Sequence, residues 1–191
     1  TQTLGDLYRA FEYVAAHADE IEVANFSLGT FFGQLRDSFD RRIAGMVNKG
    51  VVVVAGAGNS ARDVAGLNGI LDDGQITDNT LPAGLPSVMA VSAMDPIRDT
   101  VAGYSNFSAS NHANRVVFSP GAAIDIAEPG NSVGTTLPGS AYSPGGYTGT
   151  SCACPHATGL VALYIATHGR AYDAAGVYRI RQAIVDAAQP Q

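Results

Sequence analysis

A serine near residue 150 stands where nucleophilic chemistry could take place. Ser151 lies in the run Gly149-Thr150-Ser151-Cys152-Ala153-Cys154-Pro155-His156-Ala157-Thr158-Gly159. In this run Thr150 or Ser151 can cap a helix, and Pro155 suits its first turn. A hydroxyl at a helix N-terminus is surrounded by backbone N–H groups and the positive end of the helix dipole, which favour developing negative charge. The block therefore predicts both a helix start and a candidate nucleophile.

The histidines do not supply this serine with an obvious base, although a serine nucleophile needs a base and a carboxylate that orients it. His156 follows Ser151 by five positions, about 140° around a helix, so we expect it to face away as a buried, hydrogen-bonded residue. His168 would lie about 25 Å from the serine along the same helix. His17 falls in the first expected helix. His112, in an Asn-rich loop, could reach in principle, but we do not expect it to be the base.

A second motif follows a run of four valines. Gly56, Gly58 and Ala61 fit G-x-G-x-x-A after a strand, which is the dinucleotide-binding pattern. That pattern needs a helix that begins at the glycines and an acidic residue after the next strand. Here further glycines interrupt any such helix, so a nucleotide-binding domain is a disfavoured alternative. The other reading, a tight turn at the end of a strand, leaves Asn59 unexplained.

Composition narrows the class of protein. Of the 191 residues 46% are hydrophobic and 15% are charged, which is unlike a disordered chain and sufficient for one core. No apolar run reaches the roughly 20 residues of a membrane helix, so we expect no membrane span. The net charge of −6 and the single lysine argue against nucleic acid as a partner. Two cysteines about 200° apart on a helix, Cys152 and Cys154, cannot bridge each other.

The hydrophobic pattern predicts an α/β fold with a parallel sheet. Helical spacing marks helices beginning behind Thr3 and near residue 35, a fully hydrophobic helix over residues 151–168, and a last amphipathic helix. Strands are expected at 21–26, 51–54 and 88–93, and short ones at 104–107, 116–118 and 124–126. Residues 62–84 and 128–150 are rich in glycine and proline and are expected to be loops.

Six ordered motifs between residues 25 and 159 together resemble the subtilisin-like serine protease family, which includes proteinase K. They are Asn25-Phe26-Ser27-Leu28-Gly29, Gly50-Val51-Val52-Val53-Val54-Ala55-Gly56-Ala57-Gly58-Asn59, Leu85-Pro86-Ser87-Val88-Met89-Ala90-Val91, Tyr104-Ser105-Asn106-Phe107-Ser108, Ile126-Ala127-Glu128-Pro129-Gly130 and Gly149-Thr150-Ser151. The resemblance implies a three-layer subtilisin-like fold around a central, mostly parallel sheet. It also implies endopeptidase activity through an acyl-enzyme.

The resemblance assigns roles by position. Ser151 would be the nucleophile, and Asn59 would donate its side-chain amide to the oxyanion together with the Ser151 backbone N–H. Ser27, Leu28 and Gly29 would pair with the substrate backbone. The primary specificity pocket would be lined by Gly56, Ala57 and Gly58, with Ser60, whose small uncharged side chains suggest an apolar or aromatic substrate residue. Leu81-Pro82 matches a position expected to hold a cis peptide.

The family's aspartate and histidine motifs do not occur in this sequence. We therefore expect residues 1–191 to be one partial peptidase domain, incomplete at its N-terminal side, whose partner is a segment that carries both groups. The other partner would be a protein or peptide substrate. A catalytically inactive binding or assembly module is the main alternative function. The resemblance also implies secretion.

The resemblance further suggests a structural calcium ion, although the chemistry itself requires no cofactor. Pro86, Val88 and Asp125 match an arrangement in proteinase K in which two backbone carbonyls and one carboxylate hold the ion. Calcium favours such oxygen ligands. The alternative is that Asp125 is a strand-edge aspartate facing solvent.

Overall fold

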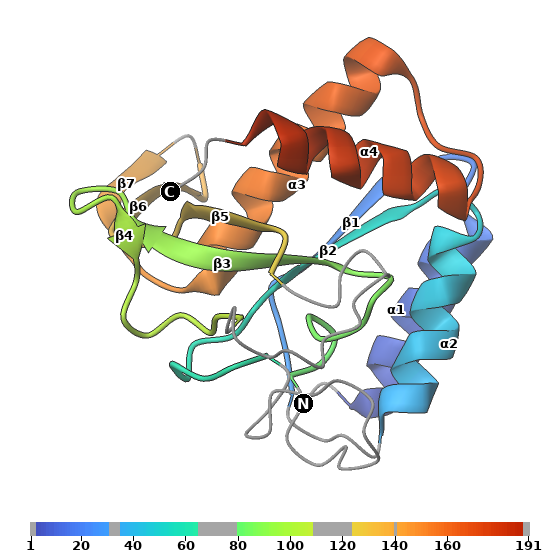
Figure 1. Cartoon of the computed structure of the whole chain (residues 1–191), viewed down its shortest axis with the longest axis horizontal. Coiled ribbons are helices and arrows are strands. Elements are labelled where there is room, and N and C mark those ends of the chain that lie inside the picture. Colours follow the sequence, from blue (N-terminus) through green and yellow to red (C-terminus); the bar gives the residue numbers. More distant parts are fainter. Residues whose placement is uncertain (1–2, 31–34, 65–79, 109–123, 140, 189–191) are drawn as a thin grey trace.

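The computed structural model describes residues 3–30, 35–64, 80–108, 124–139 and 141–188. The helices are α1 (Leu4–Ala16), α2 (Arg36–Val47), α3 (Thr150–His168) and α4 (Ala174–Ala187), and the strands are β1 (Val23–Phe26), β2 (Val52–Gly56), β3 (Met89–Asp95), β4 (Thr100–Val101), β5 (Ile126–Pro129), β6 (Val133–Leu137) and β7 (Ala141–Tyr147). Helices and strands alternate up to β2, the next five elements are strands, and two helices end the described chain (Figure 1). No helix in the described ranges is long and apolar enough to span a membrane.

The sheet is mostly parallel, as expected. Strands β1, β2, β3 and β5 lie side by side and all run in the same direction. The short β4 pairs antiparallel with the end of β3. All five residues of β2 are buried, which agrees with its unbroken apolar sequence. The α/β class is therefore confirmed.

Alternation along β1 shows that helices cover both faces of the sheet. Phe26 packs on Phe11 of α1, with ring centroids 5.2 Å apart. Its neighbour Asn25 accepts a hydrogen bond at Oδ1 from Thr158 of α3. Successive strand residues point to opposite faces, so α1 and α3 lie on opposite sides of the sheet. Figure 1 shows the same division, with α1 beside α2 and α3 beside α4.

The structure corrects several expected elements. Residues 128–150, expected to be a loop, contain the end of β5 and the antiparallel pair β6 and β7. Residues 104–107 form no strand, and only Phe107 makes an isolated bridge, to Asp63. The expected strand at 116–118 lies outside the described residues. Helix α3 begins one residue early, with Gly149 as its N-cap and no side-chain cap.

We predict that Phe11 is the main anchor of α1. Its side chain is fully buried and also contacts Phe39 of α2 at 5.5 Å between ring centroids. Phe11→Ala should lower the free energy of unfolding by about 3–5 kcal/mol, because it removes a large side chain and leaves a cavity. Urea denaturation measures this loss. The control Tyr13→Ala, in the same helix but 60% exposed, should change it by no more than about 0.5 kcal/mol; equal losses would contradict the assignment.

Candidate active site

The parallel strands bring the predicted site residues to one edge of the sheet. Ser27 follows the carboxyl end of β1, and Asn59 lies three residues beyond the end of β2. Helix α3 packs across β1, β2, β3 and β5 and has its N-terminus, with Ser151, at this same edge. The carboxyl ends of parallel strands are where α/β proteins place ligands. The fold therefore brings together residues that lie far apart in the sequence.

The side chain of Asn59 is held by the first residue of α3. Its Oδ1 accepts hydrogen bonds from the Thr150 backbone N–H at 2.8 Å and from the Thr150 hydroxyl at 3.1 Å. The same hydroxyl accepts the backbone N–H of Gly58 at 3.1 Å. Because both hydrogen bonds from Thr150 are made to the Asn59 carbonyl oxygen, the Nδ2 end of the amide is available to donate to another acceptor. Thr150 therefore sets which end of Asn59 faces the site.

The donor and the nucleophile meet over Gly149. A Cβ atom placed on this glycine would lie 3.4 Å from Asn59 Nδ2 and 3.5 Å from Ser151 Oγ. Both groups thus lie within 3.5 Å of one point. Gly149 has φ 147°, a backbone conformation that residues other than glycine rarely adopt. A glycine at this position therefore permits the backbone conformation and also leaves space for the Asn59 and Ser151 side chains. Both Ser151 and Asn59 are exposed.

The segment that follows β1, residues 27–29, is hydrogen-bonded to the backbone of Ser151. The Ser27 hydroxyl donates to the Ser151 carbonyl at 3.0 Å, and Asn25 Nδ2 donates to the Ser27 hydroxyl at 2.9 Å. Residues 27–29 are all exposed, and at Thr30 the chain pairs with Leu81 through two backbone hydrogen bonds of 2.8 Å. Leu81-Pro82 is cis, as expected. An exposed segment therefore lies directly beside Ser151.

Asn106, for which the sequence predicted no role, organises the loop that carries Asn59. It is fully buried; its Nδ2 donates to the Ala57 carbonyl at 2.8 Å, and its Oδ1 accepts the N–H groups of Ser60 and Arg62 at 2.9 and 3.2 Å. A Cβ on Gly58 would come within 2.5 Å of this amide. The motif that contains Asn106 was visible in the sequence, but these three partners lie more than 40 residues away.

The loop after β2 rules out the dinucleotide-binding pattern. Residues 57–64 contain no helix, whereas the pattern requires a helix to begin at the glycines. Ala61, which stands in the position of the pattern's last small residue, has φ 50°. Gly56 is glycine for a different reason, since a Cβ there would lie 3.0 Å from the Thr150 carbonyl oxygen. These glycines let β2 pack against the start of α3.

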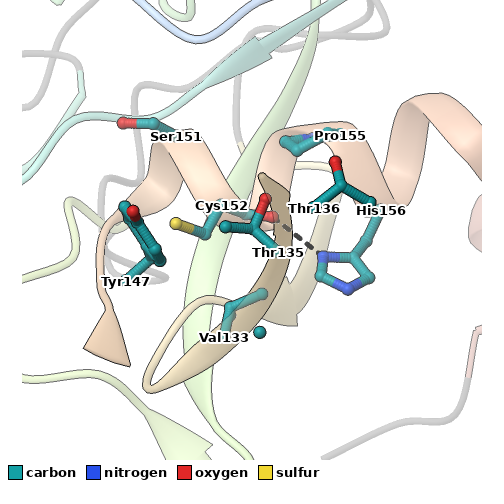
Figure 2. A pocket seen from close by; sticks show the side chains of 9 residues that line it. Val133, Thr135, Thr136, Tyr147, Ser151, Cys152, Pro155 and His156 are labelled. Carbon is teal, nitrogen blue, oxygen red and sulfur yellow. Dashed lines mark hydrogen bonds between the residues drawn. The ribbon is translucent and has the colours of Figure 1, made fainter. Parts of the chain in front are cut away.

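A cavity of about 510 Å³ lies beside Ser151, between the start of α3 and the β6–β7 pair (Figure 2). Its wall includes Val133 and Thr135 of β6, Tyr147 of β7, and Cys152. This wall was not predicted from the sequence, because residues 128–150 were expected to be a loop. The Pro-Gly pair at residues 138–139, between two threonine- and tyrosine-containing runs, was the available turn signal.

The described histidines do not hydrogen-bond to the Ser151 hydroxyl. His156 also lines the cavity, but its Nδ1 is hydrogen-bonded to the Cys152 carbonyl at 2.8 Å. Figure 2 shows its ring pointing away from Ser151. It is exposed, which corrects the expectation of burial. His168 ends α3 and His17 caps α1. His112 lies outside the described residues.

The predicted calcium ligands do not fit an additional cation. Arg181 of α4 donates to the Pro86 carbonyl at 2.9 Å and to both carboxylate oxygens of Asp125 at 2.9 and 3.1 Å. A guanidinium therefore already engages two of the three expected ligands, the third being Val88. Asp125 does not face solvent either, since its side chain is only 10% exposed. The described residues also contain no cluster of three or more His, Cys, Asp or Glu that could hold a metal.

The comparison with known families gives a clear match. A family model described as the subtilase family matches residues 2–191. An extracellular protease of Xanthomonas campestris pv. campestris is 37% identical over 156 residues, which is 78% of this chain and 22% of that protein. Subtilisin E of Bacillus subtilis (strain 168) is 34% identical over 155 residues, which is 80% of this chain and 33% of that protein.

The solved structures agree in fold. A cold-adapted subtilisin-like serine proteinase superposes with a TM-score of 0.73 at 24% identity, over 98% of this chain and 56% of that one. PagA, a prenylagaramide maturation protease, gives a TM-score of 0.69 at 22% identity, over all of this chain and 59% of its own. The chain thus spans less than two thirds of each protein named here.

We predict that the two cysteines differ in reactivity. Cys152 is partly exposed in the cavity, whereas Cys154 is buried and its pKa is raised to about 11 by loss of solvation. Burial also raises the pKa of Cys152. Because the thiolate is the reactive form, iodoacetamide should modify Cys152 first, more slowly than it modifies free cysteine, and faster as the pH rises.

Peptide mass mapping at pH 8 measures the order in which the two cysteines are modified. With a pKa of about 11, only about one Cys154 thiol in 1,000 is ionised at this pH, so Cys154 should react last. Cys154→Ala should leave the modified amount unchanged, and Cys152→Ala should abolish it. Earlier modification of Cys154 would show that the helix start is packed differently.

Proposed function

The chain belongs to the subtilase family, a family of serine proteases, and we propose that it supplies the nucleophile and the oxyanion hole of an endopeptidase. The observation that carries the proposal is the meeting of Ser151 Oγ and Asn59 Nδ2 around one point above Gly149. Neither group alone would indicate peptide hydrolysis. Together they provide an attacking oxygen and a donor for the negative charge that the attack creates.

In this proposal Ser151 Oγ attacks the carbonyl carbon of a peptide bond, while a base takes the hydroxyl proton and then gives it to the leaving amine. The carbonyl oxygen gains negative charge in the tetrahedral intermediate and accepts hydrogen bonds from Asn59 Nδ2 and the Ser151 backbone N–H. Collapse of the intermediate breaks the C–N bond, releases the amine and leaves an acyl-enzyme, which water then hydrolyses. One such donor contributes about 3–4 kcal/mol to transition-state stabilisation, a magnitude known from subtilisin itself.

The exposed segment Ser27-Leu28-Gly29 would bind the substrate backbone as an added strand. Its position supports this role, because the Ser27 hydroxyl bonds to the Ser151 carbonyl and the segment is exposed. Gly56, Ala57 and Gly58 would line the primary specificity pocket. Two of these residues are glycines and the third is an alanine, so the lining would be small and uncharged and would favour an apolar or aromatic residue in the substrate.

We propose that the base and its orienting carboxylate come from a segment outside residues 1–191. The described histidines support this view, since His17 and His168 lie at the far ends of their helices and the His156 ring is bonded to Cys152. In the described sheet β1 pairs only with β2, so its outer edge can accept another strand. A segment added there would lie beside the end of β1 and near Ser151.

The protein would act outside the cell. Its Xanthomonas relative is named an extracellular protease. The chemistry proposed for Ser151 and Asn59 requires no cofactor.

The triad proposal predicts that the chain alone reacts poorly with a serine-directed probe. A fluorophosphonate should label Ser151 at least about 10³-fold more slowly in the chain alone than in its mixture with a polypeptide carrying the family's aspartate and histidine segment, because the serine lacks its base. Intact mass spectrometry measures the labelling rate, and Ser151→Ala is the matched control.

Rapid labelling of Ser151 in the chain alone would contradict the proposal that the base lies elsewhere. An absence of labelling in both preparations would instead favour a catalytically inactive binding module.

A further inference from the structure

A charged side chain lies in the interior of the molecule, away from the candidate active site. Arg181 of α4 is 1% exposed, and its partner Asp125 is 10% exposed. The two form an ion pair with a nitrogen–oxygen distance of 2.9 Å. A buried charge requires both an opposite charge and hydrogen-bond partners, because it has lost its water. The groups that surround this guanidinium therefore indicate what the buried charge does.

The guanidinium joins three segments that are distant in the sequence. One of its terminal nitrogens donates to the Pro86 carbonyl, just before β3, and the other donates to both carboxylate oxygens of Asp125, just before β5. Asp125 also accepts the Ala90 backbone N–H at 2.7 Å. Helix α4 is thus fastened to the starts of two neighbouring strands through one positive charge. Its acceptors, a backbone carbonyl and a carboxylate, are oxygen groups of the kind that calcium prefers as ligands.

The same atoms leave little room for a metal ion. A calcium ion would take oxygen ligands at about 2.3–2.6 Å, and here a carbonyl and a carboxylate are already shared with a fixed positive charge. A second cation in contact with the same oxygens would lie close to the guanidinium, in a site with little water to screen the repulsion.

We propose that the Arg181 guanidinium takes the place of a structural metal ion at Pro86 and Asp125. The local structure is then held by a covalently attached cation and does not depend on calcium. Removal of the guanidinium opens a cation site with the same oxygen ligands. This inference is independent of the proposed peptidase activity, because none of the three residues belongs to the candidate active site.

The test is thermal unfolding in millimolar calcium chloride and in excess chelator. If calcium binds to the folded chain, a free calcium concentration of about 100 times the Kd would raise the Tm of a chain of this size by roughly 5–10 °C. Wild type and Asp125→Asn should show the same calcium response, because no calcium binds at Asp125. A wild-type increase of several degrees that Asp125→Asn abolishes would overturn the proposal.

The matched variant is Arg181→Met, which keeps a long apolar side chain and removes the charge. It should have a lower Tm than wild type in chelator and gain a calcium-dependent increase of several degrees. The double variant Arg181→Met/Asp125→Asn should lose that gain. A single variant that folds but gains no calcium response would also overturn the proposal, because the guanidinium would then not stand in for a metal.

A luminescence titration needs no unstable variant. The Tyr178 ring lies 5.7 Å from the guanidinium carbon, and the chain has no tryptophan, so Tb³⁺ bound at Asp125 would be sensitised by Tyr178. Wild type and Tyr178→Phe should give the same Tb³⁺ luminescence. A wild-type signal that Tyr178→Phe removes would place a metal ion at this site and contradict the proposal.

Discussion

The site depends on one interaction, the pair of hydrogen bonds that Thr150 donates to Asn59 Oδ1. They join the loop after β2 to the first turn of α3 across 91 residues of sequence. Without them the Asn59 amide could rotate, and its carbonyl end would repel the oxygen that it is proposed to stabilise. The Thr150 hydroxyl is buried and also accepts the Gly58 N–H, so its position is determined from both sides. Orientation is thereby established before any substrate binds.

This interaction imposes a packing constraint on the surrounding residues. Gly56 and Gly149 must be glycine so that β2, the Asn59 loop and the start of α3 can approach within van der Waals distance. Asn106 replaces the regular hydrogen bonds that the loop lacks by bonding to one carbonyl and two N–H groups. The parallel sheet supplies the remaining requirement, because it ends β1 and β2 at the same edge. The geometry of the candidate site is therefore a consequence of backbone packing.

Local patterns in the sequence were sufficient to predict the α/β class, the burial of β2, and the start of a helix near Ser151. They were insufficient where the outcome depends on distant partners. The α3 N-cap is Gly149 because the Thr150 hydroxyl is bonded to Asn59 and Gly58, which no local rule foresees. The β6–β7 pair was missed because its residues are mostly exposed and rich in glycine, so that their apolar alternation is weak.

The roles of buried polar residues also could not be predicted from local sequence patterns. Arg181 follows an amphipathic pattern that predicts a helix but not that its charge lies in the interior, paired with a residue 56 positions earlier. The role of Asn106 also depends on partners far along the chain. For Ser151 and Asn59 the resemblance to a family supplied what local reasoning could not, namely that the two groups converge. The structure then places both beside Gly149.

The most direct test of this convergence is the kinetics of Asn59→Ala in a preparation in which the aspartate and histidine segment restores peptide hydrolysis. If Asn59 donates to the oxyanion, kcat should fall by about 10²- to 10³-fold while KM changes little, because the hydrogen bond forms mainly in the transition state. An unchanged kcat, or an increase confined to KM, would contradict the account, since Asn59 would then not act on the carbonyl that Ser151 attacks.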